Sequence, residues 1–356
     1  MTVPPETLRS RRRLGHALIG VAVVLAAVGW VTARPVPPAG GEERGSVDGS
    51  APSLRVSRAR EPRASETGSE PEPVPTVAAA GDIACDPHHE FFNGGEGTAK
   101  WCRADDTRAL LRRLDPDVVL PLGDTQYDEG RLAEYQASYD LSWGRLLDRT
   151  RPAVGNHEYY ASPNARGYFT YFGERAGPAG QGWYSYELGS WHVVALNSNC
   201  QMLPCGPGSP QHEWLAADLA DSDASCTLAY FHHPRFSSGP HGDDPSVTPL
   251  WRLLHAAGAE AILVGHDHIY ERFRPLTPGG IVDEPYGLRQ FTVGTGGAQL
   301  YPVDEVRRHS VTRNTRSFGV LEVALRDGSY RWRFVPVGER GYGDRGTAAC
   351  HEAPPV

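Results

Sequence analysis

The chain has 356 residues, of which 40% are apolar, and a formal net charge of −8. This length and apolar content permit one large domain or two ordinary ones with a sizeable core, and they exclude a wholly disordered protein. Residues 1–33 carry four Arg and one Glu, which leaves a net charge of −11 on residues 34–356 and argues against broad binding to nucleic acids or other polyanions.

The N-terminal segment has the pattern of an export signal. Arg9 and three further Arg residues at 11–13 precede an apolar run from Ala17 to Val31. That run has 15 residues, fewer than the ~20 that a membrane-spanning helix needs. We expect residues 1–33 to be a signal peptide cleaved after Ala33, with retention as a signal anchor as the alternative. The basic stretch also resembles a twin-arginine signal.

Residues 34–75 are rich in Pro, Gly, Ser and charged residues and contain almost no aromatic residues. Such a composition cannot bury enough surface to fold, so we predict a disordered linker. The folded domain is then expected over residues 76–356. An exported domain of this kind would be secreted or tethered to the outer face of the cytoplasmic membrane.

The six cysteines of an exported chain are expected to be paired. One pair encloses a short Pro/Gly loop, a second closes an insertion, and the third holds the C-terminus. Sequence alone permits 15 pairings of six cysteines, and a thiolate metal site is disfavoured because no C-x-x-C spacing occurs. The expected pairs, in this order, are Cys200 with Cys205, Cys85 with Cys102, and Cys226 with Cys350.

The folded part begins with a βαβαβ pattern. Strands are predicted over residues 76–80, 118–122 and 152–154, and helices over 104–114 and 131–147. Parallel strands present the residues that follow them at one edge of a sheet. The polar residues in these positions are Asp82, Asp124, Asn156 and His157.

The second half of the chain is mostly β. Segments 183–188 and 191–198 alternate around Gly189-Ser190, which predicts a hairpin of a second sheet. Ser209 and Pro210 have the pattern of a helix start. The natural architecture is two sheets packed face to face with helices outside. The remaining predictions are helices over 210–219 and 249–257 and strands over 227–231, 261–264, 290–293, 320–325 and 330–335.

Five short polar blocks each follow an apolar run with strand character. Alone, each would more often be a cap, a turn or a satisfied polar group. Together they indicate a two-metal hydrolytic centre, because strand ends bring ligands from distant parts of the chain to one place. The blocks are Gly81-Asp82-Ile83, Gly123-Asp124-Thr125-Gln126-Tyr127, Gly155-Asn156-His157-Glu158, His232-His233 and Gly265-His266-Asp267-His268.

These blocks resemble the motifs of calcineurin-like metallophosphoesterases and, within them, of the purple acid phosphatase branch. The resemblance runs from about Val77 to Gly297, and the blocks 155–158 and 265–272 carry it most specifically. It implies an α/β fold, a four-layer αββα sandwich with two mixed β-sheets, and two metal ions that share one bridging carboxylate.

The resemblance also implies which residues bind the ions. Oxygen-rich ligation suits ferric iron, and imidazoles with an amide suit zinc, manganese or ferrous iron. Many relatives have Asp-x-His in the first block, where this chain has Ala84, and a Tyr127 phenolate would replace the missing imidazole. A Tyr127 that only packs beneath the site is the alternative. The implied ligands are Asp124 as the bridge, Asp82, Tyr127 and His268 on one ion, and Asn156, His232 and His266 on the other.

We hypothesise in-line attack of metal-bound hydroxide on phosphorus, with His157 protonating or steadying the leaving oxygen. His241 resembles in spacing a substrate-facing His of purple acid phosphatases, although a solvated loop His is an equal alternative. We expect His233 and Asp267 to support the ligands, and Glu271 with Arg272 to form a polar network beside them.

The leading interpretation is an exported phosphoesterase that hydrolyses small phosphate monoesters. A phosphodiesterase or nucleotide-processing hydrolase could use the same site, since substrate choice depends on loops. A non-catalytic envelope protein that keeps the metal-bound sandwich is an alternative of a different class. We expect no nucleic-acid partner and no membrane contact beyond an N-terminal anchor, and the sequence does not predict an oligomeric state.

Overall fold

The computed structural model describes residues 73–338 and 341–355. The predicted signal over 1–33 and nearly all of the predicted linker over 34–75 lie outside the described residues, so both stay predictions. None of the helices in the described part is long and apolar enough to span a membrane.

The first sheet has five strands in the order β12-β11-β10-β1-β2. Its interior strand β1 pairs in parallel with β2 and antiparallel with β10. Four of the five β1 residues are fully buried and apolar, which is typical of a strand covered on both faces. The strands are β1 (Thr76–Ala80), β2 (Val118–Pro121), β10 (Gly319–Arg326), β11 (Ser329–Pro336) and β12 (Arg345–Ala349).

The second sheet has seven strands in the order β3-β4-β5-β6-β8-β7-β9. Strands β4, β5, β6 and β8 run parallel, and the outer strands are antiparallel to their neighbours. The strands are β3 (Tyr184–Leu188), β4 (Trp191–Ala195), β5 (Cys226–Tyr230), β6 (Ala261–Val264), β7 (Tyr270–Leu276), β8 (Leu288–Val293) and β9 (Ser310–Asn314).

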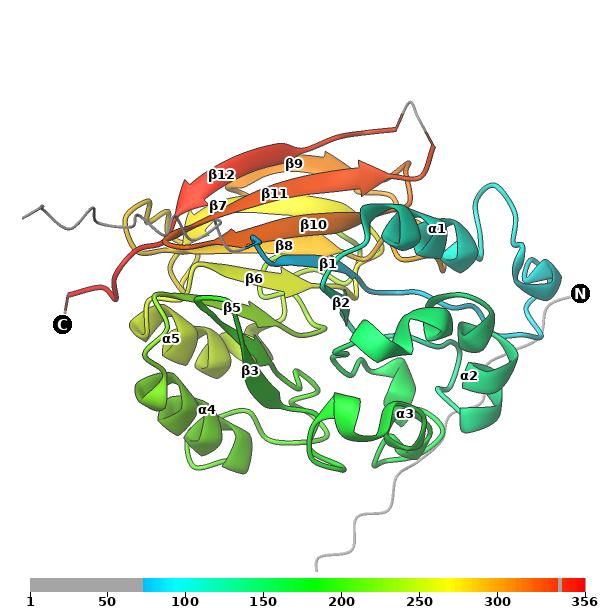
Figure 1. Cartoon of the computed structure of the whole chain (residues 1–356), viewed down its shortest axis with the longest axis horizontal. Helices are drawn as coiled ribbons and strands as arrows, with labels where there is room; N and C mark the ends of the chain where they lie inside the picture. The colour runs from blue at the N-terminus through cyan, green and yellow to red at the C-terminus, as the bar shows by residue number, and fades with distance from the viewer. Residues whose placement is uncertain (1–72, 339–340, 356) are drawn as a thin grey trace, which may run out of the picture. The chain divides into compact units, whose positions relative to one another are not determined.

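Alternating side chains of the second sheet belong to two separate cores. Leu228 and Leu263 pack into a core shared with the first sheet, whereas Ala229 and Ile262 face the helices α4 and α5. Figure 1 shows α4 and α5 along one sheet and α1, α2 and α3 on the other side of the fold. The predicted four-layer sandwich with two mixed sheets is therefore confirmed. The helices are α1 (Ala104–Leu114), α2 (Leu132–Ala137), α3 (Arg166–Phe172), α4 (Pro210–Asp221) and α5 (Thr248–Ala256).

The single helix predicted over 131–147 is wrong. Helix α2 ends at Ala137, and two short 3₁₀ segments follow at Tyr139–Leu141 and Trp143–Arg149. The hydroxyl of Ser138 donates to the carbonyl of Cys85 at 2.7 Å, and the amide of Tyr139 donates to the Gln126 side chain at 3.1 Å. These long-range bonds replace helical ones, so tertiary contacts override a helical pattern.

The strand predicted over 152–154 is also wrong, because only two isolated bridges form in this region, Val119 with Thr150 and Leu122 with Ala153. Pro152 has no amide hydrogen and cannot continue a ladder. The sequence analysis did not predict α3, β7, β9 and β12. A bulge interrupts β7 at residues 272–275, and this irregularity hides its alternation.

All three predicted disulfides are present. Their Cα atoms are 5.4, 5.2 and 5.8 Å apart, in the usual range for such bonds. The third bond joins the start of β5 to the residue after β12, and therefore links the two sheets covalently. The bonds are Cys85–Cys102, Cys200–Cys205 and Cys226–Cys350.

Candidate metal centre

The polar blocks lie together beyond the carboxyl ends of four strands. Asp82 follows β1 and Asp124 follows β2 in the first sheet, while His232 follows β5 and His266 follows β6 in the second. Because the two sheets are packed together, their strand ends deliver donors to one place between them. Each sheet thus contributes about half of the candidate site.

The predicted oxygen-rich set is closely gathered. The Tyr127 hydroxyl lies 2.9 Å from Asp82 Oδ1, 2.9 Å from His268 Nε2 and 3.3 Å from Asp124 Oδ2. His268 Nε2 is 3.3 Å from Asp82 Oδ1. All four side chains are buried.

The predicted nitrogen-rich set meets the first at Asp124. His232 Nε2 lies 3.2 Å from Asp124 Oδ2, 3.1 Å from Asn156 Oδ1 and 3.2 Å from His266 Nδ1. Asp124 Oδ2 thus contacts side chains of both sets, Tyr127 in one and His232 in the other, which is the position that a bridging ligand requires. Metal binding by these seven side chains stays a prediction.

The donor chemistry of the cluster fits metal ions. His232 Nδ1 donates to the Leu122 carbonyl at 2.8 Å and His268 Nδ1 donates to the Gln299 carbonyl at 3.0 Å. Each bond directs the lone pair of Nε2 toward the carboxylates. Carboxylate oxygens and imidazole lone pairs that converge in a buried space repel one another unless a proton or a metal ion lies between them. Burial opposes protonation of His232, but Asp124 outweighs it and raises the pKa of His232 to about 9, so a metal ion would replace that proton.

The local charges have opposite effects on the acidic groups. Burial would raise the pKa of Asp124, but the imidazoles of His232 and His157 outweigh it and hold that pKa well below its ordinary value. Burial, together with Asp82 and Asp124, raises the pKa of Tyr127 well above its ordinary value. The phenol therefore stays protonated unless a bound cation replaces its proton.

The backbone explains why glycines precede the candidate ligands. Asp82, Asp124 and His266 have positive φ angles of 61°, 45° and 71°, which non-glycine residues adopt at a cost of about 1–3 kcal/mol. A Cβ atom at Gly265 would lie 2.8 Å from Asp82 Oδ2, and one at Gly155 would overlap Asp124. The glycines permit these close approaches.

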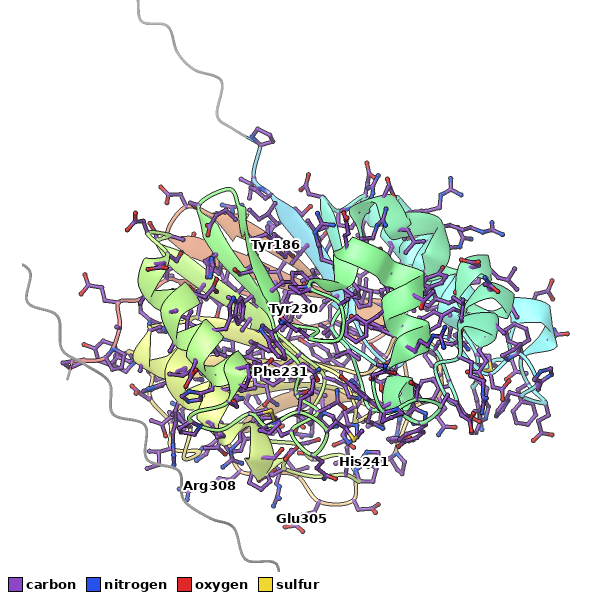
Figure 2. The ribbon with its side chains drawn as sticks, turned by 90° about the horizontal axis from the view of Figure 1, so that it is seen from below. Tyr186, Tyr230, Phe231, His241, Glu305 and Arg308 are labelled. Atoms are coloured by element: carbon purple, nitrogen blue, oxygen red, sulfur yellow. A yellow bond between two sulfur atoms is a disulfide. The ribbon has the colours of Figure 1, made fainter. Side chains whose placement is uncertain are left out.

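Both predicted catalytic histidines border the cluster. His157 Nδ1 lies 2.6 Å from the carbonyl of Asp128, and its Nε2 lies 3.9 Å from Asp124 Oδ2. His241 Nδ1 lies 2.9 Å from Asp267 Oδ1, and its ring centroid is 4.3 Å from that of His266. Figure 2 shows the loop of His241 on the same side of the molecule as Glu305 and Arg308.

Glu158 is a residue to which the sequence analysis assigned no role. Its buried carboxylate accepts the amides of Asp124, Thr125 and Gly155 at 3.1, 2.8 and 2.7 Å, and the Tyr135 hydroxyl at 3.1 Å. It therefore joins two of the ligand-bearing loops. The sequence offered one signal for this role: Glu158 is an acidic residue in the block 155–158 to which neither metal binding nor catalysis was assigned.

Further buried polar contacts lie beside the cluster. Asp267 is fully buried and orients His241 through both the ring and the backbone amide. Glu271 accepts the amide of Ser238 at 2.8 Å, and Arg272 pairs with Asp344 at 2.7 Å. These groups position loops and do not enter the cluster.

Two cavities open beside the cluster. One of about 470 Å³ is lined by Asn156, His266 and His241 together with Tyr160 and Met202. The other, of about 150 Å³, lies beside the oxygen-rich set. The residues that line it include Tyr127, His157, His268, His89 and Tyr301.

Residues 75–270 match the family model described as calcineurin-like phosphoesterase, which is more than half of the chain. The chain belongs to the calcineurin-like phosphoesterase family. Within it the resemblance to the purple acid phosphatase branch is confirmed. Purple acid phosphatase 21 of Arabidopsis thaliana is 30% identical over 58% of this chain and 50% of its own length, and purple acid phosphatase 18 of that plant is 30% identical over 62% and 49%.

Solved structures agree on the fold. A purple acid phosphatase from yellow lupin seeds superposes with a TM-score of 0.62 at 18% identity, over 78% of this chain and 54% of that chain. The inner-membrane-complex anchor GAP50 of Plasmodium superposes with a TM-score of 0.54 at 14% identity, over 78% and 89%. This family member spans about half the length of the curated plant relatives that it matches.

Proposed function

We propose that this protein is a phosphoesterase that hydrolyses small phosphate monoesters at a dinuclear metal centre. One observation carries the proposal: contacts of 2.9–3.3 Å join side chains from five separate blocks into one cluster that includes Asp124. Support also comes from the family match and from curated relatives that are named purple acid phosphatases. A non-catalytic envelope protein that keeps bound metal would need the same donor set, so the activity of metal-loaded protein separates the two.

Asp82, Tyr127 and His268 would hold one ion, and the remaining ligands would hold the other with Asp124 between them. When bound, the two ions would neutralise the phosphate and activate the attacking water. Ferric iron suits the oxygen-rich set, because a phenol whose pKa is raised by burial loses its proton only to a strong cation.

His157 is the proposed proton donor to the leaving oxygen. With Nδ1 donating to the Asp128 carbonyl, Nε2 faces the cluster and has a proton to give when the ring is an imidazolium; the side chain is 22% exposed, so a substrate can reach it. His241, held by Asp267, would bind a phosphate oxygen from the opposite side. Both roles follow from where the ring nitrogens face.

The larger cavity would hold the organic part of the ester. Tyr160 and Met202 line it and are 60% and 45% exposed, so their apolar surfaces are accessible to an organic group. The carboxylates of Asp243 and Asp244 lie on its wall. An uncharged or apolar organic group suits this cavity better than a polyphosphate chain.

The decisive experiment compares 4-nitrophenyl phosphate with bis(4-nitrophenyl) phosphate, using protein whose metal content has been measured. We expect turnover of the monoester, with the Asp124→Asn variant as the control for contaminating activity. Turnover of the diester alone would favour the diesterase alternative. Inactivity of protein loaded with two metals toward both would contradict catalysis.

Metal identity and export need their own measurements. If the first ion is ferric, the protein should have a visible charge-transfer band that Tyr127→Phe abolishes, and a colourless wild type without iron would exclude that assignment. Three disulfides support an exported protein. N-terminal sequencing of protein from its host would test cleavage after Ala33.

A further inference from the structure

His233 is a histidine beside the cluster that the proposed ligand set does not use. Its ring centroid lies 4.6 Å from that of His266 and 4.9 Å from that of His232. It lines the larger cavity together with Asn156 and His241. The imidazole therefore faces the space in which the substrate is proposed to bind.

The hydroxyl of Ser198 determines which ring nitrogen of His233 carries the proton. Ser198 Oγ accepts the backbone amides of His232 at 3.2 Å and of His233 at 2.9 Å, which uses both of its lone pairs. Its own hydrogen must then be donated, and His233 Nδ1 lies 2.9 Å away. Nδ1 is thus the acceptor, and the proton of the neutral ring is on Nε2.

Ser198 is well suited to hold this arrangement. It is 1% exposed and follows β4, next to the loop closed by the Cys200–Cys205 disulfide. No water competes for a hydroxyl buried to that degree, so the bond to His233 is maintained. Among the described residues, no acceptor for His233 Nε2 is found within the protein, and His233 is one of the residues that line the cavity.

We propose that His233 is a substrate-binding residue that donates a hydrogen bond from Nε2 to a phosphate oxygen, and that Ser198 is the positioning residue that fixes its tautomer. This inference rests on the proposed function, since it assumes that the phosphate binds at the cluster. It adds a donor for substrate charge to those already assigned.

The competing role for His233 is that of a third imidazole ligand. Ring nitrogens of His232, His233 and His266 lie within 4.8 Å of one another, so distance alone permits it. A metal-binding nitrogen must carry a free lone pair, however, and the bond from Ser198 occupies Nδ1 while the proton occupies Nε2. Tautomer and metal content therefore separate the two roles.

The first test observes the tautomer directly. Long-range ¹H–¹⁵N correlation spectra of the zinc-loaded protein should show His233 as a neutral ring protonated at Nε2, and Ser198→Ala should convert it to a mixture of tautomers. An Nδ1-protonated ring, or a metal-shifted Nε2 in the wild type, would overturn the proposal. This measurement does not depend on turnover.

The second test measures binding of inorganic phosphate by calorimetry and hydrolysis of 4-nitrophenyl phosphate. His233→Ala should weaken phosphate binding and lower kcat/KM by about 10- to 100-fold, the usual effect of a lost bond to a charged acceptor, with metal content unchanged. His233→Gln, whose amide can place a donor near the position of Nε2, should recover part of the loss. His88→Ala, which removes an exposed imidazole remote from the larger cavity, is the control.

The outcomes distinguish the two proposals. A wild type that binds phosphate in a His233-dependent manner but hydrolyses no ester would contradict the proposed function and keep this inference. Phosphate affinity that is the same in the wild type and His233→Ala would overturn the inference whatever the activity. Loss of metal from His233→Ala, with metal retained by His88→Ala, would make His233 a ligand and overturn it as well.

Discussion

Two buried carboxyl groups lie at opposite ends of the strands in contrasting surroundings: Asp124 follows β2 of the first sheet, and Glu260 precedes β6 of the second. At the carboxyl ends of the strands, burial opposes ionisation of Asp124, yet His232 and His157 hold its pKa well below the ordinary value. At the amino ends, Glu260 has no such imidazoles beside it, and burial raises its pKa to about 8. Burial alone thus gives a neutral acid, and only the end with the histidines keeps a carboxylate that can bind cations.

The largest effect is expected at the end that carries the cluster. Asp124→Asn removes a carboxylate charge that contacts side chains of both donor sets, so activity should be lost together with at least one metal ion. Elemental analysis and the monoester assay would measure both. Glu260→Gln is the matched change at the other end and should alter neither; full activity with both ions in Asp124→Asn would refute the bridging role.

The next effect concerns proton transfer without metal binding. His157→Ala should lower kcat by about 10²–10⁴-fold, the usual contribution of a general acid, while metal content and KM change little. Separate determination of kcat and KM would establish this. Loss of a metal ion from the variant would instead make His157 a ligand.

A smaller effect is expected from a glycine that adjoins the cluster. A methyl group at Gly155 would overlap Asp124, whereas one at Gly206 would meet no atom within 4 Å. Gly155→Ala should therefore destabilise the protein by about 1–3 kcal/mol and reduce metal affinity. Thermal unfolding with and without metal would detect this, and Gly206→Ala should match the wild type.

The smallest effect on catalysis is expected from Glu260, whose contribution is to stability. Its folded pKa of about 8 exceeds the ordinary 4.5, so its stabilising effect is complete below pH 4.5 and is lost as the pH rises through 8. Glu260→Gln should unfold at a higher temperature than the wild type at pH 9 and at a similar temperature at pH 5. A difference in unfolding temperature between the variant and the wild type that is the same at pH 5 and pH 9 would contradict the raised pKa of Glu260.

Strongly patterned elements were predictable from sequence, residue by residue. The predicted ranges 76–80, 104–114 and 261–264 are identical to β1, α1 and β6, because each is a short buried strand or a helix with one clear apolar face. One helix was predicted over 131–147, but the observed helix α2 ends just before Ser138 and Tyr139, which bond to distant residues. Such contacts leave no trace in local periodicity.

The same distinction applies to the candidate site. The convergence of the blocks was predictable from a glycine followed by a polar residue at each strand end. The strand end indicates where the polar side chain lies, and the glycine indicates that another segment packs closely against the backbone there. The roles of Glu158 and Ser198 were not, since each depends on which amides and rings the fold brings to it. Buried hydrogen-bond partners from distant segments have no sequence period.

The Cys226–Cys350 disulfide has a practical consequence for anyone who handles this protein. It closes a loop of 124 residues between the two sheets, worth about 4–5 kcal/mol by chain entropy, and it lies at the strand ends opposite the donor cluster. Bound ions would hold the two sheets together at one end of the strands, and the Cys226–Cys350 disulfide holds them together at the other end. A buffer that contains both a chelator and a thiol reductant would release both restraints at once, whereas either reagent alone would leave one in place.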